Sequence, residues 1–366
     1  MSLVLTRIQN IRAKSNLDKY EYRPSRYGAL DAFIVQSNDP TGILTPELKE
    51  KARMSIGNTL ETPVIDYDGG ITIGNTRELT IADSENTSRM ISITFATYSF
   101  GFTIAPAMYM NNEIGIQRDF ETKLMKYIYK LAQTLDEAAL AKIAAAKTAV
   151  IKNSLLYDKT GNAINAKWTE RENLLGDLNV IMGANDFYGQ LHIVGDAGVE
   201  SIIKKLTQKD LYNIENKRNE YNDKIVHLTN HIAAAQGKYA QGYAINAGSL
   251  GMLIRFERDC LLGTVSGDGH EWGIATLPLL NIPCGTYFYD SVGNYSGIAG
   301  AATADMVRTR KEHYGFAVDI AFITPYNSVP SGEGALASPI LAFNVSSENA
   351  YYGLPVQQVS PVPTGE

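Results

Sequence analysis

The longest regular pattern in the chain is an apolar stripe between Asn111 and Asn153. Apolar residues recur there at spacings of three and four, the period of an α-helix, at Ile116, Phe120, Leu124, Ile128, Leu131, Leu135, Ala139, Ile143, Ala146 and Val150. Asn111-Asn112-Glu113 is a typical helix start, and Asn153 and Ser154 are stop signals. With no Gly or Pro inside it, the stripe predicts one helix of about 55 Å at 1.5 Å per residue.

A helix of that length belongs to a coiled coil, to a repeat element or to a spine on which a sheet lies. Alanine dominates the stripe after Leu140, which is a weak pattern for a coiled coil. Small side chains also allow another backbone to approach closely, so we predict a spine. An ordinary long core helix is the alternative.

Strand patterns precede this helix. Thr45-Pro46-Glu47 begins a short helix through Arg53, and Thr62-Pro63 is expected to break that helix. Two strands are then predicted, with a polar turn region from Ala82 to Arg89. In the second strand the apolar positions are odd up to Phe95 and even from Tyr98 to Ile104, which predicts a bulge or a strong twist between them.

The predicted hairpin has an apolar face and no obvious partner within its own segment. A long two-stranded hairpin is not stable alone in water. We therefore predict that it contacts another subunit, through Ile71, Ile73, Leu79, Ile81, Ile91, Ile93, Phe95, Tyr98 and Phe100.

The second half of the chain predicts an α/β region followed by strands. Val180-Ile181-Met182 and 190–194 are strand-like, a capped helix is expected from Asp196 to Gln208, and 224–229 is strand-like again. His313 to Tyr326 alternates large apolar with small or polar residues, the pattern of a strand with one buried face. Residues 340–345 are one more candidate strand, before a proline-containing tail.

Length, hydropathy and charge limit the classes of protein to which the chain can belong. The chain of 366 residues is long enough for two domains or one elaborated domain. It shows neither a signal sequence nor an apolar run of 18 residues, so we expect a protein that is made in the cytoplasm and has no membrane partner. The net charge of −6 argues against a basic duplex-binding surface.

The charge is unevenly distributed. Residues 1–60 hold nine Lys or Arg against six Asp or Glu, whereas the remainder has an excess of acid. This basic arm is predicted either to dock on the acidic surface of a neighbouring copy or to be a frayed, solvated terminus.

Catalytic motifs are missing from the sequence. Phosphate-binding, dinucleotide-binding, zinc-protease and nucleophile-elbow patterns are all absent, and Cys260 and Cys284 form no metal-binding spacing. His227 and His231 would share one face of a helix, but their segment reads as a strand. We predict no catalytic residues, no cofactor and no metal. The densest polar cluster contains Asp268, His270 and Glu271, and is either an enzyme site or an exposed turn.

The order of these elements resembles the major capsid proteins of tailed bacteriophages of the Hong-Kong-97 type, a fold shared with encapsulins. The resemblance covers nearly the whole chain. It includes the late stretches Lys311 to Asp319 and Phe322 to Tyr326, together with Val226 to Ile232, Gly242-Tyr243-Ala244 and Gly248 to Gly251.

This resemblance implies an α+β fold with five parts. They are an N-terminal arm at 1–60, an extended hairpin or E-loop at 61–110, a peripheral domain with the spine helix at 111–180 and 275–350, an axial domain at 181–274, and a tail at 351–366. It also implies a structural protein that assembles in host cytoplasm, through hexamers and pentamers, into the icosahedral capsid of a virion enclosing double-stranded DNA. An encapsulin-like compartment is the alternative.

The resemblance further implies partners: a separate scaffold protein, unless this chain is a processed form, a portal and decoration proteins, with packaged DNA bound without sequence specificity. Some members of the family join E-loop lysines to asparagines of neighbours. Glu61 to Met110 contains Arg77 and Arg89 and no lysine, so no such covalent link is expected here.

Overall fold

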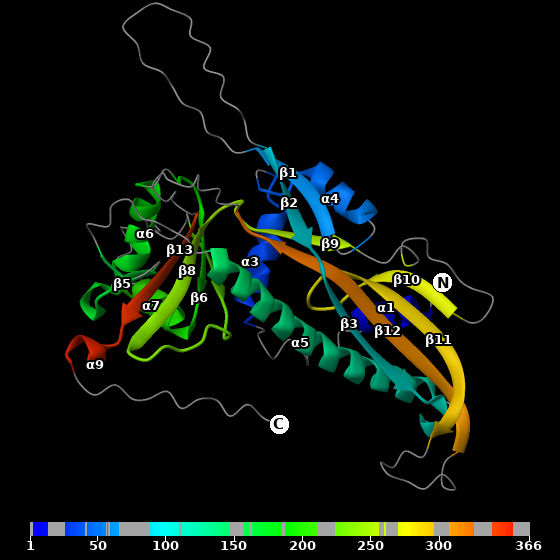
Figure 1. The fold of residues 1–366 in the computed structure, drawn as a ribbon. Helices are drawn as coiled ribbons and strands as arrows, with labels where there is room; N and C mark the ends of the chain where they lie inside the picture. The colour runs from blue at the N-terminus through cyan, green and yellow to red at the C-terminus, as the bar shows by residue number, and fades with distance from the viewer. Residues whose placement is uncertain are drawn as a thin grey trace, which may run out of the picture.

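The computed structural model describes residues 3–13, 26–40, 42–55, 57, 59–65, 88–109, 112–146, 157–160, 163–184, 187–210, 224–255, 260, 270–295, 307–325 and 339–353. Helices and three β-sheets alternate along this part of the chain, which confirms the predicted α+β class (Figure 1). None of the described helices is long and apolar enough to cross a membrane.

The central layer is an antiparallel sheet in the strand order β10–β11–β12–β3, with β9 also pairing with β12. Its described strands are β3 (Ala96–Ile104), β9 (Gly251–Arg255), β10 (His270–Thr276), β11 (Pro283–Tyr295) and β12 (Val307–Ile323). β12 confirms the predicted late strand, since Tyr314, Phe316, Val318 and Ile320 on one face are all buried.

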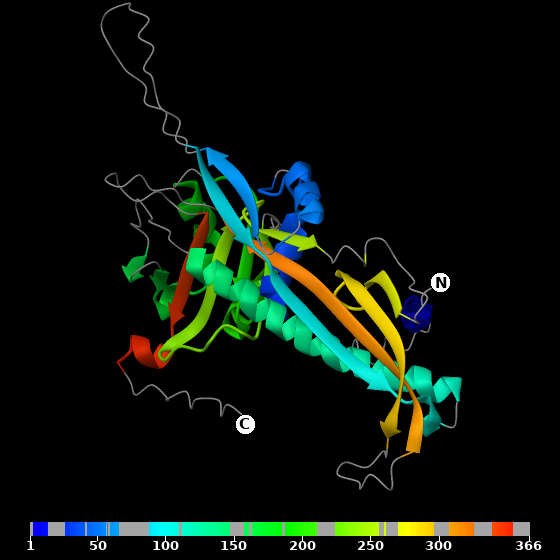
Figure 2. The same ribbon diagram turned by 45° about the vertical axis from the view of Figure 1, so that its right-hand side comes forward.

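Helix α5 (Glu113–Ala146) runs along this sheet, close to β3 in both views (Figures 1 and 2). Its 34 residues span about 51 Å. The predicted stripe is confirmed: every member from Ile116 to Ile143 is buried. The Asn112 side chain accepts the Ile114 backbone N–H at 3.0 Å, which caps the start. Residues 147–153 of the predicted helix lie outside the described residues.

A second, mixed sheet has the strand order β4–β5–β13–β8–β6–β7, in which β13 runs parallel to β5 and β6 parallel to β7. Its described strands are β4 (Asp158–Thr160), β5 (Ala163–Ala166), β6 (Leu191–Gly195), β7 (Lys224–Leu228), β8 (Lys238–Asn246) and β13 (Ile340–Ser346). Helices α6 (Leu174–Gly183) and α7 (Ala197–Asp210) share its core, through Leu178 and Ile202 among others.

The described residues also include three short helical elements. They are η2 (Pro106–Tyr109), η3 (Trp168–Glu170) and α9 (Glu348–Tyr351). Asp196 caps α7 as the sequence predicted, by accepting the Val199 N–H at 3.0 Å. Val180-Ile181-Met182, predicted as a strand, instead ends α6, because Ile181 and Met182 are buried at helical spacing with Leu178.

The described parts of the N-terminal arm pack on their own subunit, so the frayed-terminus interpretation is wrong for them, whereas docking on a neighbouring copy stays a prediction. α1 (Leu3–Ala13) buries Val4, Ile8 and Ile11 in the main core. α3 (Gly28–Ser37) buries Leu30 and Phe33 in the same core. A side chain at Gly28 would meet the backbone of His227 and Leu228 at 2.6 Å, so the close approach of α3 to β7 requires glycine there.

The third sheet pairs β1 (Thr59–Ile65) with β2 (Ser88–Thr94), after the short helix α4 (Pro46–Met54). The helix already ends at Met54, and Thr62-Pro63, expected to break it, instead lies within β1. Pro63 has no N–H to donate, and the position is tolerated because β1 has only one described neighbour. Ser88 and Arg89, predicted as turn, begin β2.

The pairing of the strands does not follow the domain ranges that the resemblance implies. Residues 158–166 and 340–346, grouped above with the spine helix, pair with strands of the 181–274 range. Conversely, β9, from the 181–274 range, pairs with β12.

Candidate functional site: a possible assembly surface

The hairpin β1–β2 rises from one end of the central sheet and has no further described strand beside it (Figure 2). Its base is held by a small core in which Leu60 and Phe95 pack with Leu44, Leu253 and Ala321. Within the described residues, the two strands of the hairpin pair only with each other, and Lys51 Nζ donates to the Glu61 carbonyl at 2.8 Å. The hairpin is therefore a two-stranded sheet with no third strand among the described residues.

Phe95 lies between two consecutive strands that belong to different sheets. β2 ends at Thr94 and pairs with β1, whereas β3 begins at Ala96 and pairs with β12. The Phe95 side chain is only 4% exposed, and the guanidinium of Arg255 lies 4.4 Å from its ring centroid. The sequence predicted a bulge or a strong twist within one strand; instead, the strand ends at Thr94, and after Phe95 the chain enters a different sheet.

Arg255 fixes this junction through a set of polar contacts. Its Nε donates to Asp319 Oδ2 at 2.9 Å, and Nη1 donates to Ser55 Oγ at 3.3 Å and to the Gly57 carbonyl. Asp319 Oδ1 also accepts from the Thr97 hydroxyl at 2.7 Å. The direction in which the hairpin leaves the subunit is thus set by polar contacts from four segments, three of them part-buried and the Thr97–Asp319 contact exposed.

The predicted contact residues divide into three groups. Ile71, Ile73, Leu79 and Ile81 lie outside the described residues. Phe95, Tyr98 and Phe100 already pack within their own subunit; Phe100 stacks on Phe316 with ring centroids 4.9 Å apart, and burial raises the pKa of Tyr98. Ile93 is half-buried at the hairpin base, and for Ile91 only the backbone position in β2 is described.

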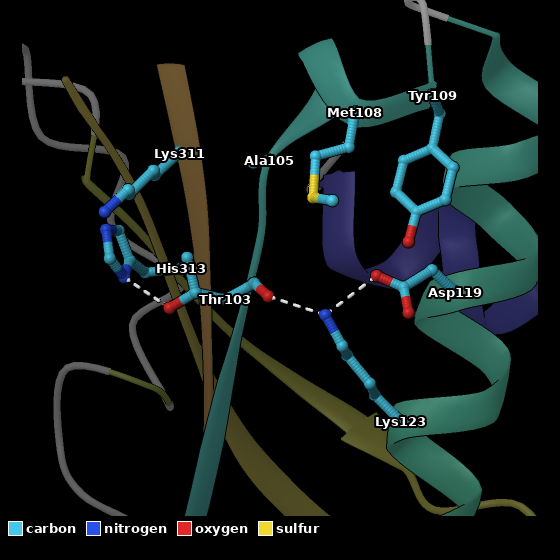
Figure 3. A pocket seen from close by; sticks show the side chains of 8 residues that line it. All are labelled: Thr103, Ala105, Met108, Tyr109, Asp119, Lys123, Lys311 and His313. Atoms are coloured by element: carbon cyan, nitrogen blue, oxygen red, sulfur yellow. Dashed lines mark hydrogen bonds and ion pairs between the residues drawn. The ribbon is translucent and has the colours of Figure 1, made fainter. Parts of the chain in front are cut away.

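A hollow of about 410 Å³ lies at the opposite end of β3, where η2 and α5 begin (Figure 3). Lys123 of α5 reaches across to the Thr103 carbonyl at 2.9 Å and pairs with Asp119 at 2.8 Å. On the far side of β3, Lys311 and His313 of β12 line the same hollow. Met108, 47% exposed, adds an apolar wall.

Each ring nitrogen of His313 has a hydroxyl partner. Its Nδ1 lies 2.9 Å from the Thr103 hydroxyl and its Nε2 lies 2.7 Å from the Ser291 hydroxyl, while its ring stacks on Tyr289. Burial, with the nearby Lys311 charge, lowers the pKa of His313. At pH 7 the charge of the hollow therefore comes from two ammonium groups and one carboxylate. Sequence reasoning missed this group, because its residues are spread over more than 200 positions.

The two described residues of the predicted polar cluster do not form a site together. Asp268 lies outside the described residues, and His270 and Glu271 are consecutive in β10, so they point to opposite faces. His270 contacts the Tyr287 hydroxyl, whereas Glu271 accepts the Leu3 backbone N–H at 3.1 Å. Both side chains have structural partners.

His227 and His231, for which the sequence predicted no metal, each contact a different aspartate. His227 Nδ1 lies 2.6 Å from Asp31, and His231 Nδ1 lies 2.7 Å from the buried Asp136. His227 also meets His192 at 2.9 Å, a contact not foreseen from the sequence. Among the described residues, no group of three or more His, Cys, Asp or Glu side chains is arranged to hold a metal ion.

The chain was compared with protein families, curated proteins and solved structures. No protein-family model and no curated protein matches the sequence. Among solved structures, a chain of "Mycobacterium phage Che8" aligns at 11% identity and a TM-score of 0.41, over 81% of this chain and 87% of that one. "Cyanophage Pam1 capsid asymmetric unit" gives 10% identity and a TM-score of 0.38 over 81% and 87%. "Capsid of Ralstonia phage GP4" gives 9% and 0.38 over 81% and 86%. The sequence identity and the structural similarity to each of these chains are low.

Proposed function

We propose that this chain is the major capsid protein of a tailed bacteriophage, which assembles in many copies into an icosahedral shell around double-stranded DNA. The observation that carries the proposal is the hairpin β1–β2, which leaves a fixed junction at Phe95 and pairs with no third strand among the described residues. A strand pair of this kind gains stability by lying on another copy, at roughly 25 cal/mol per Å² of apolar area buried.

The rest of the subunit supports a building-block role. A 34-residue helix backed by the antiparallel sheet forms an elongated body that runs on from the hairpin (Figures 1 and 2). The six-stranded sheet at one end of this body corresponds, in the proposed assignment, to a domain around the symmetry axis of a capsomer. Many weak contacts repeated by symmetry would then close the shell.

The partners follow from this role. Assembly would take place in host cytoplasm with a scaffold protein and a portal, and the acidic remainder of the chain suits an inner wall that does not grip packaged DNA. The polar contacts of His270 and Glu271 favour this structural role over the enzyme reading of their cluster.

The test is microscopy and sedimentation of the expressed protein, alone and with its neighbouring gene products. Rings, shells or capsomers are expected. A 40 kDa monomer under every assembly condition would contradict the proposal. An encapsulin-like compartment is the second candidate, favoured by the same architecture; shells from the native source that hold a protein cargo and no DNA would select it.

A further inference from the structure

We infer that the first half of α3, from Gly28 to Phe33, is an acid-sensitive latch on the six-stranded sheet. Addition of a proton to the pair formed by His192 and His227 releases this half of the helix, while the second half stays attached beside β9. The latch belongs to the subunit by itself, and its operation requires no second copy and no shell.

Helix α3 lies between the six-stranded sheet and the central sheet and contacts both (Figure 1). Its first half packs on β7, and Gly28 lies so close to the β7 backbone that no side chain fits there. Its second half is tied to the start of β9. The Gln36 side-chain oxygen accepts the Leu250 N–H at 2.9 Å, and Ser37 Oγ accepts the Met252 N–H at 2.6 Å. Each half of α3 is therefore held to a different sheet by its own contacts.

Two histidines and a carboxylate form a chain of contacts at the first half of α3. His192 Nδ1 of β6 lies 2.9 Å from His227 Nε2 of β7, and His227 Nδ1 lies 2.6 Å from Asp31 Oδ2 of α3. Both histidines are only 3% exposed, and their ring centroids are 5.2 Å apart. Whichever nitrogen donates, only one hydrogen fits between two nitrogens at this distance. The contact therefore exists only while at most one of the two rings is charged.

The carboxylates that act on this pair come from α3 and the residues after it. Asp31 is bound to His227, and Asp39, which follows α3, is the other carboxylate whose charge acts on His192. Where β8 pairs with β6, its one titratable side chain on the face of the pair is Tyr243. Burial raises the pKa of Tyr243, so this group is neutral at neutral and acidic pH.

The first half of α3 also covers a buried carboxylate of α5. Asp136 is fully buried, and it accepts the Leu30 N–H at 2.9 Å and the Thr229 hydroxyl at 2.6 Å. Its third partner is His231, whose Nδ1 lies 2.7 Å from Asp136 Oδ2. The Leu30 amide therefore reports directly whether this half of the helix is in place.

Acid favours release because the packed form of the latch resists a proton. Burial, together with the neighbouring His227, lowers the pKa of His192 from 6.5 to about 4. In a ring that water reaches, the pKa returns towards 6.5, so between pH 6.5 and 4 the released form binds a proton that the packed form does not. Because β6 and β7 stay paired beneath the rings, the element that moves to admit water is the helix that covers them.

Hydrogen exchange of the free subunit at pH 7 and pH 5 tests the latch. Each exchange rate is divided by that of an unfolded chain at the same pH, which removes the intrinsic effect of pH. The amides from Gly28 to Phe33, including Leu30, should lose at least about tenfold in protection at pH 5. The amides of Leu250 and Met252, which bind the second half of α3, should change by less than about twofold.

Two variants separate the histidine pair from other effects of acid. His192→Asn keeps a side chain that can bond to His227 Nε2 but cannot gain a charge, so it should keep the protection of Gly28 to Phe33 at pH 5. His313→Asn removes a histidine of β12 whose pKa burial also lowers, and it should lose protection as the wild type does. Circular dichroism at pH 7 checks the fold of each variant.

The latch is wrong if the wild type keeps its protection at pH 5, or if both halves of α3 lose protection equally. It is also wrong if a folded His192→Asn variant loses as much protection as the wild type. Should this variant fail to fold, the wild-type pattern decides alone: a loss confined to the first half of α3 supports the latch, and an equal loss in both halves contradicts it.

Discussion

Arg7 Nη2 lies 3.1 Å from Glu312 Oε2, and both side chains are about 5% exposed, although the residues are 305 positions apart. The guanidinium also lies 5.8 Å from the Tyr314 ring centroid, and the Tyr314 hydroxyl donates to the same Glu312 oxygen at 2.6 Å. The first helix of the arm is thereby locked onto the central strand of the main sheet.

Removal of one partner from this pair should be costly. Arg7→Met removes the nearer of the two guanidinium groups beside the buried Glu312, since Arg310 Nη2 remains 3.6 Å from Glu312 Oε1. A loss at the lower end of the range of about 3–5 kcal/mol for a broken buried pair is therefore expected in the free energy of unfolding. The double variant Arg7→Met with Glu312→Gln should recover part of this loss, because no unpaired charge remains. Urea unfolding of the free subunit measures both. Equal stability of the Arg7 variant and the wild type would show that the buried pair does not hold the arm.

Acid should destabilise the subunit through His192. Its ring is buried and stacks on His227, and burial together with His227 lowers the pKa of His192 from 6.5 to about 4. Between pH 6.5 and 4 the unfolded chain therefore binds a proton that the folded chain does not, so stability falls as the pH falls, by on the order of 2 kcal/mol. The melting temperature from pH 8 to 4 measures this.

The His192→Asn variant is the control for that pH dependence. It removes the titrating ring, so its melting temperature should fall less steeply between pH 6.5 and 4 than that of the wild type. Identical slopes in the two proteins would assign the acid sensitivity to other groups.

The spine helix should be more sensitive to bulk on its buried stripe than beside it. Ala139 is fully buried in the main core, and Leu there must displace packed neighbours, which typically costs 1–3 kcal/mol. Ala141→Leu adds the same side chain at an exposed position of the same helix and should be within about 0.5 kcal/mol of wild type. Chemical denaturation of the two variants, read by helical circular dichroism, compares them.

Shortening of the hairpin should separate folding from assembly. Ile65 and Ser88 are cross-strand partners, so Asn-Gly in place of residues 66–87 would close the strands with a two-residue turn. The shortened subunit should unfold with a free energy close to that of wild type, because the core that holds the hairpin base is retained. Its yield of shells should fall strongly in negative-stain microscopy. Normal shells would remove the assembly role of this segment.

Local patterns determined much of this molecule. The stripe from Ile116 to Ile143 predicted α5, the alternation after His313 predicted β12, and the change of parity at Phe95 located the junction of two sheets. These signals lie within single elements, where burial of one face imposes a period on the sequence.

Tertiary structure decided what depends on contacts between distant segments. The fully buried Asp136 lies beside the apolar stripe of α5 and is explained only by the three donors around it, the Leu30 N–H, the Thr229 hydroxyl and the His231 ring. The contact of His192 with His227, and the placement of Lys123 and Lys311 around one hollow, have no periodic signature for the same reason. A buried charge and a composite surface are created by the approach of separate elements, and no local period in the sequence records that approach.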